Sequence, residues 1–231
     1  MRRIYIISLL FLLVSVSAFT QTDSLFSTNL TGKTFVENRT YRGDQYYNTD
    51  WLTGDVLLST GDVVYNKKLK YNGLLDELIW LNTVIPGVYS IDRPLIYEFR
   101  LKNFNNRVVR FVKINVKDST LGHKNDIFVE ELVKGNISLY VQRKISITDV
   151  MMIEREHKLY PLNFIGPTPV YFIKLSTDNY LPMSALNRAS LLGLFPLQKK
   201  NLKKLATQNH VDLRTEKGLM EMIELMNKVE F

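Results

Sequence analysis

Residues 55–81 read DVLLSTGDVVYNKKLKYNGLLDELIWL, and two turns divide this stretch into short extended pieces. The first turn is Thr60-Gly61-Asp62, and the second begins with Asn72-Gly73, a dipeptide that strongly favours a hairpin turn. The extended pieces on either side of the turns are 55–60, 63–65, 67–71 and 77–81. The stretch therefore predicts two β-hairpins.

The two-residue alternation of apolar and polar side chains continues beyond these hairpins. In 95–102, Leu95, Tyr97, Phe99 and Leu101 lie on one face and the charged residues at 98, 100 and 102 on the other, which predicts a half-buried strand. Further strands are predicted over 107–117, 128–133, 137–147 and 170–175. A succession of about eight to ten short strands with turns between them predicts an antiparallel β-sandwich or a partly closed β-barrel.

Beyond residue 178 the apolar residues follow the helical period. Ser184 and Thr215 can each cap a helix, and Pro196 is tolerated in a first helical turn. The predicted helices are 184–192, 196–208 and 215–229. Strands followed by helices predict an α+β chain, with an antiparallel β domain over 44–180 and a C-terminal helical subdomain over 181–231.

Residues 1–20 have the pattern of a secretory signal peptide: Arg2 and Arg3, an apolar run, and small residues at 17–20, with Thr20 as the preferred cleavage position. We therefore expect export to the periplasm or the outside of the cell. The chain contains no cysteine, so we expect neither a lipid-modified N-terminal cysteine nor a disulfide. Residues 21–43 are rich in polar residues and predict a flexible or irregular leader.

The composition is that of an ordinary globular protein, with 45% hydrophobic and 23% charged residues and a net charge of +7 over 231 residues. The positive charge is concentrated in 184–211, which contains basic residues but no Asp or Glu. The prediction is a nearly neutral body that carries one basic helix.

The basic helix is the first candidate binding site. Its members are Lys199, Lys200, Lys203 and Lys204. They form two i,i+4 pairs on one helix face, where like charges repel each other unless something opposes them. Such a face is most often simply solvated, but anionic lipid headgroups or the acidic last helix could oppose the lysines. We expect an envelope protein or an anionic membrane surface as partner. Nucleic acid is not expected, because no aromatic residues accompany the lysines.

Aromatic residues form the second candidate site, where the polar leader meets the first strand. The cluster consists of Tyr41, Tyr46, Tyr47 and Trp51. Exposed rings could stack on sugars or peptides, but such residues more often attach a leader to the sheet, and we favour that interpretation.

Catalytic and metal-binding patterns are missing. The sequence has neither a Gly-x-Ser-x-Gly elbow nor a glycine-rich phosphate loop. Glu154 and His157 are three residues apart, which is half a metal site at best, and we interpret them as solvated charges. We predict no catalytic residue, no metal site and no cofactor.

Short phrases resemble a loose group of uncharacterised, signal-peptide-bearing envelope proteins from Bacteroidetes-type bacteria. The phrases lie at 51–56, 61–62, 69–72, 76–78, 171–174 and 195–202. The resemblance spans about residues 51–231 and implies export from a Gram-negative cell, but no activity.

These observations predict an exported, non-enzymatic protein of the cell envelope that acts as a binding or structural accessory module. Two alternatives stay open: a hydrolase of envelope polysaccharide that uses carboxylates dispersed along the chain, and a carrier of an apolar ligand inside a partly closed barrel. The sequence defines neither the partner nor the oligomeric state.

Overall fold

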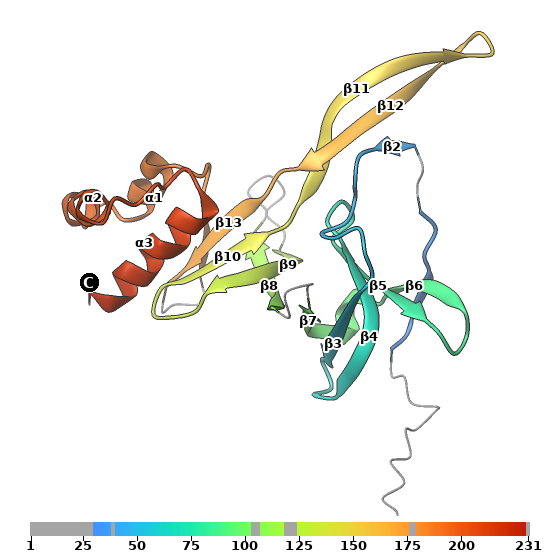
Figure 1. The fold of residues 1–231 in the computed structure, drawn as a ribbon, viewed down its shortest axis with the longest axis horizontal. Helices are drawn as coiled ribbons and strands as arrows, with labels where there is room; N and C mark the ends of the chain where they lie inside the picture. The colour runs from blue at the N-terminus through green and yellow to red at the C-terminus, as the bar shows by residue number, and fades with distance from the viewer. Residues whose placement is uncertain (1–29, 38–39, 103–106, 118–123, 176–178, 230–231) are drawn as a thin grey trace, which may run out of the picture.

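The computed structural model describes residues 30–37, 40–102, 107–117, 124–175 and 179–229 (Figure 1). The predicted signal peptide, 1–20, lies outside the described residues. The described chain has a β-rich body, a long hairpin that projects from it, and three helices on the opposite side (Figure 1).

The strands are β1 (Gly32–Thr34), β2 (Tyr41–Arg42), β3 (Leu52–Leu58), β4 (Val63–Asn72), β5 (Glu77–Asn82), β6 (Gly87–Ile91), β7 (Ile96–Lys102), β8 (Val108–Lys117), β9 (Lys124–Val133), β10 (Ser138–Gln142), β11 (Ile145–Arg155), β12 (Lys158–Pro167), β13 (Val170–Lys174) and β14 (Tyr180–Pro182). The helices are the 3-10 helix η1 (Arg93–Leu95) and the α-helices α1 (Arg188–Leu194), α2 (Lys199–Gln208) and α3 (Glu216–Lys228).

An 11-stranded sheet, in which neighbouring strands are antiparallel, forms the body in the order β1-β6-β5-β4-β3-β7-β8-β9-β10-β13-β14. A second sheet has the order β11-β12-β2, in which β2 joins β12 in parallel. The predicted fold class is confirmed: an antiparallel β body is followed by a helical C-terminal part.

The large sheet curls so that strands separated along it face each other. The ring of Tyr71 on β4 lies 5.0 Å from that of Phe111 on β8, although β3 and β7 stand between these strands. Three strand spacings in a flat sheet amount to about 14 Å. The sheet therefore bends into the form of a partly closed barrel, and buried rings fill its interior. These rings belong to Tyr71, Phe99, Phe111 and Phe128.

A buried carboxylate holds the curled sheet together. Asp76, in the turn between β4 and β5, accepts hydrogen bonds from the Tyr71 hydroxyl at 2.6 Å and from the backbone N–H of Phe128 on β9 at 3.3 Å. Its second oxygen lies 2.7 Å from Nη1 of Arg93. The carboxylate thereby links strands β4 and β9 across the barrel.

Both hairpins predicted from 55–81 are confirmed, and they share the strand β4. Asn66 has a positive φ of 53° and donates its backbone N–H to Asp55 Oδ1, which bends β4 without ending it. The backbone of Gly73 lies close to that of Arg143, and a Cβ at position 73 would lie 2.3 Å from the carbonyl oxygen of Arg143. This close approach, not a positive φ, requires glycine there.

Two strand predictions need correction. Tyr97, expected on the buried face of its strand, is 59% exposed, because the pairing of β3 with β7 shifts register at Leu58. The expected strand 137–147 is two strands, β10 in the large sheet and β11 in the small one. The chain leaves the large sheet at Arg143, whose side chain forms ion pairs with two other elements.

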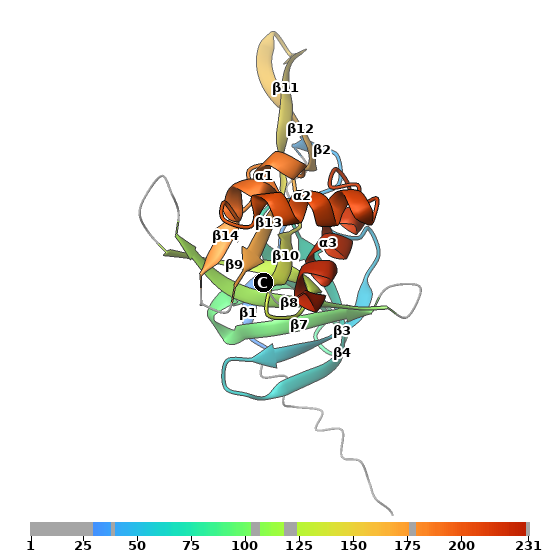
Figure 2. The same cartoon turned by 90° about the vertical axis from the view of Figure 1, so that its left-hand side faces the viewer.

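The three helices lie within the predicted range 181–231. Thr215 caps α3 as expected, but Asn187 rather than Ser184 caps α1. Helix α3 packs on β9 and β10, and its Asn227 side chain exchanges two hydrogen bonds with the backbone of Ile137. The helices lie over the adjoining strands (Figure 2). Together they bury a second apolar core.

The leader predicted over 21–43 contributes two short strands where the structure describes it. Gly32–Thr34 form the edge strand β1 beside β6, and Tyr41–Arg42 form β2 beside β12.

Candidate binding surfaces

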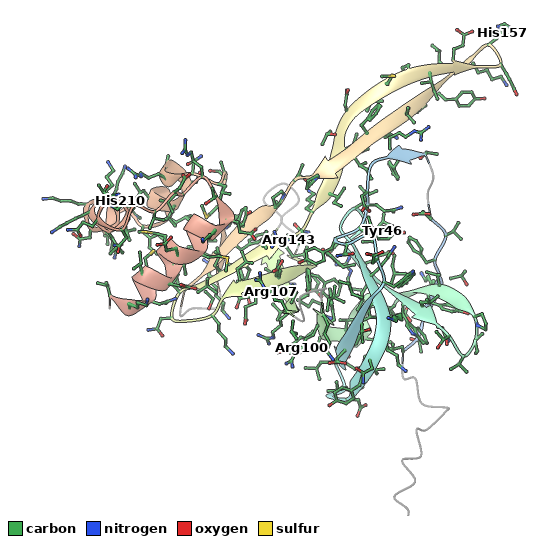
Figure 3. The ribbon with its side chains drawn as sticks, in the orientation of Figure 1. Tyr46, Arg100, Arg107, Arg143, His157 and His210 are labelled. Atoms are coloured by element: carbon green, nitrogen blue, oxygen red, sulfur yellow. The ribbon has the colours of Figure 1, made fainter. Side chains whose placement is uncertain are left out.

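An ion network with Arg143 at its centre joins the body to the helices. Figure 3 shows the position of Arg143. Nε of Arg143 lies 2.5 Å from Glu130 Oε2, and its two terminal nitrogens lie 2.7 and 2.9 Å from the oxygens of Glu216 on α3. The hydroxyl of Tyr171 donates to Glu216 at 3.0 Å. Glu130 is only 2% exposed, so its ion pair neutralises a buried charge, whereas Arg143 and Glu216 are partly exposed.

The pKa values in this network follow from its pairing. Burial acts to raise the pKa of Glu216, but the hydrogen bonds and charge of Arg143 outweigh it and hold the pKa below its ordinary value. Burial and Glu216 raise the pKa of the Tyr171 hydroxyl to about 12. At neutral pH the Glu216 carboxylate is therefore charged and the Tyr171 hydroxyl neutral, which suits a structural connection.

A second network covers the outer face of β7 and β8. Arg110 lies 2.5 Å from Glu98 and 2.7 Å from Glu131, and Arg100 lies 2.8 Å from Glu98. Burial acts to raise the pKa of Glu98, but the two arginines outweigh it and lower the pKa. Asp76 shows the opposite result: burial raises its pKa despite the hydrogen bonds from Tyr71 and Arg93.

Glu216→Gln provides a test of the network by pH. Because folding lowers the pKa of Glu216, its charge stabilises the fold above the ordinary value of 4.5, and this contribution is lost as the pH falls through the lower folded-state value. Urea unfolding between pH 7 and pH 3 should therefore show a shallower pH dependence for Glu216→Gln than for the natural protein. Equal slopes would contradict the pairing.

Three residues of the predicted aromatic cluster, Tyr46, Tyr47 and Trp51, contact residues of the large sheet, whereas Tyr41 lies in β2 beside β12. Tyr47 packs edge-on against Phe111 at 5.5 Å, and its backbone N–H donates to the carbonyl of Tyr71. Nζ of Lys70 lies 4.6 Å from the ring centre of Tyr46 and 5.3 Å from that of Trp51. Tyr46, Tyr47 and Trp51 are half-buried, and each has a contact within the fold.

The basic helix corresponds to α2, and all four predicted lysines are exposed on it. Leu202 and Ala206 are buried on its opposite face, as the spacing predicts. Within the described ranges none of the four lysines forms an ion pair, so the acidic residues of α3 do not neutralise them. These four exposed lysines of α2 are Lys199, Lys200, Lys203 and Lys204.

The sequence reading missed the most prominent surface, the arm, which we define as the hairpin of β11 and β12. It projects from the body and ends at His157 (Figures 1 and 3). Six large apolar side chains on it are 44–65% exposed. They are Ile147, Val150, Met151, Met152, Leu159 and Tyr160.

Both faces of the arm carry apolar side chains. Met151 pairs with Leu162 and Met152 with Pro161, and consecutive strand residues point to opposite faces. Strand β11 stands at the end of the small sheet, and no other strand of the described residues pairs with its outer edge. The arm therefore presents apolar side chains together with a strand edge that no other described strand covers.

Glu154 and His157 lie at the tip of the arm, with Oε1 and Nδ1 3.7 Å apart and both side chains exposed. No group of three or more metal-ligating side chains occurs among the residues that the structure describes. In the same residues, no helix combines the length and the apolar character that crossing a membrane requires.

Comparisons with known proteins add no relative: no family model, curated protein or solved structure matches the chain.

Proposed function

We propose that the protein is an exported, non-enzymatic binding module of the cell envelope that binds another envelope protein through its arm. The export part rests on the signal-peptide pattern of residues 1–20. The binding part rests on the projection of a hairpin that exposes apolar side chains on both faces.

The physics of the hairpin supports a protein partner. A two-stranded ribbon is at best marginally stable in water by itself, and an open, apolar edge strand is a template for pairing. A lipid tail can cover apolar side chains but cannot satisfy the backbone N–H and C=O groups of the β11 edge. A strand of another polypeptide can do both by adding to β11.

The ionisable groups of the body and of α3 also favour binding over catalysis. Asp76, Glu98 and Glu216 have shifted pKa values, and each of them is held by arginine or tyrosine donors within the fold. The barrel interior, which the carrier alternative would use, is filled by aromatic rings. We therefore propose a binding module in preference to a hydrolase or a carrier.

Replacing Met151 and Met152 together by Lys should abolish the complex with the partner, because one charge then stands on each face of the arm. The free energy of unfolding should change by no more than about 0.5 kcal/mol, since both side chains are exposed. Native electrophoresis of envelope extracts from the producing cell measures the size of the complex.

The matched control is Tyr65→Lys with Tyr97→Lys, which adds the same charge at exposed aromatic residues of the body. This control should keep the complex. Two results would contradict the proposal. One is a natural protein that migrates as a single chain or only as copies of itself. The other is an arm variant that keeps the complex.

A further inference from the structure

Helix α2 and the turn before it form a second surface, which we call the basic end. Its members are Leu197, Lys199, Lys200, Lys203 and Lys204. Leu202 and Ala206 anchor the helix on the second core, which leaves the lysine face turned to solvent. The basic end lies across the molecule from the tip of the arm (Figures 1 and 3).

The charge of the basic end is not compensated within the described fold. The four lysines form no ion pair there, and the whole segment 184–211 contains no acidic residue. The first turn of α2 holds Lys199 and Lys200 without an acidic residue, so these charges stand at the positive end of the helix dipole. An anionic surface would remove this repulsion.

Leu197 adds an apolar element to the charged one. Its side chain is 93% exposed in the turn that leads into α2, the highest exposure among the large apolar residues of the described ranges. Beside it an open hollow of about 700 Å³ is lined mainly by apolar residues. They include Leu194, Phe195, Leu202 and Met226.

An exposed leucine next to a cluster of lysines suits the interface of a lipid bilayer. The lysine ammonium groups can contact anionic headgroups while their aliphatic stems and the leucine enter the boundary with the acyl chains. A membrane on this side would leave the arm directed away from the lipid (Figure 1). An acidic protein could oppose the lysines, but it would also have to accommodate a single projecting leucine.

We propose that the basic end docks the protein on anionic lipid bilayers. The contact is peripheral: Leu197 enters the interface, and the four lysines supply the electrostatic attraction. It uses residues separate from the arm, so the failure of one proposal leaves the other standing.

Flotation with vesicles tests this docking, with the protein purified from the envelope of the producing cell so that the predicted signal peptide has been removed. The protein should float with vesicles of phosphatidylcholine and phosphatidylglycerol at 7:3, and binding to pure phosphatidylcholine should be at least about tenfold weaker. Raising the salt to about 0.5 M should release it, because screening shortens the reach of the charges. Changing all four lysines to Gln should weaken binding at least about tenfold, and Leu197→Ser a few-fold.

The matched control changes Lys33, Lys68, Lys102 and Lys158 to Gln, which removes the same charge from exposed positions on four strands. It should float like the natural protein, as should the Met151→Lys, Met152→Lys arm variant. Thermal unfolding monitored by circular dichroism verifies that each variant is folded. The docking proposal is overturned if the natural protein binds both vesicle types equally or neither, or if control and basic-end variants lose binding to the same extent.

Discussion

Arg143→Met should lower the free energy of unfolding by about 3–5 kcal/mol. Arg143 forms the ion pair of the buried Glu130 and a two-bond pair with Glu216, the first residue of α3. Without the guanidinium, Glu130 is left as an uncompensated charge inside the protein, which costs more than a lost surface pair. Urea unfolding at pH 7 measures the loss.

The double variant Arg143→Met, Glu130→Met separates the cost of the unpaired charge from lost packing. Because it removes both charges and keeps similar volume, most of the stability should return. A loss below about 1 kcal/mol for the single variant would show that the network does not join the helices to the body.

Phe111→Ala should lower the free energy of unfolding by a similar amount, about 3–5 kcal/mol. The Phe111 ring is fully buried and contacts the rings of Tyr47, Tyr71 and Phe99. Removing the Phe111 ring leaves a cavity inside the curled sheet, where side chains of strands that are not neighbours in the sheet contact each other. Tyr65→Ala, at a residue that is 63% exposed, should change stability by less than about 0.5 kcal/mol.

The curl itself can be tested with a double-mutant cycle between Tyr71→Leu and Phe111→Leu. Strands β4 and β8 are not neighbours in the sheet, so their rings interact only if the sheet bends. We expect a coupling energy of about 0.5–1.5 kcal/mol. Strict additivity would contradict the partly closed barrel.

The hairpins of 55–81 could be predicted because local signals agree there. Asn72 shows this: its side chain accepts hydrogen bonds from the N–H groups of Leu74 and Leu75, a turn that its type favours. Thr215 is similar, since its hydroxyl caps α3 within three residues of its own position. Such interactions lie within the reach of a local pattern.

The arm could not be predicted in the same way. Its two-residue turn, Glu156-His157, has φ values of 50° and 59°, which normally favour Asn or Gly. Both faces of its strands carry apolar residues, so the alternation that marks a half-buried strand is weak. Neither the turn nor the strands therefore gave a clear hairpin signal.

The ion network was hidden for a different reason. Arg143 interrupts an apolar alternation, which suggests a single exposed residue in one strand. Its partner Glu216 lies 73 positions further along the chain, and only the packing of α3 on the body brings the two together. The lysines of α2 could be predicted as exposed, because their spacing alone sets the helix face.

Site-specific photo-crosslinking in living cells tests the arm most directly. A photoreactive residue at position 152, on the arm, should yield one discrete adduct with a different envelope protein, whereas the same residue at position 65, on the body, should yield none. An adduct from position 65 but not from position 152, or an adduct at 152 only with a second copy of this chain, would contradict binding of another envelope protein through the arm.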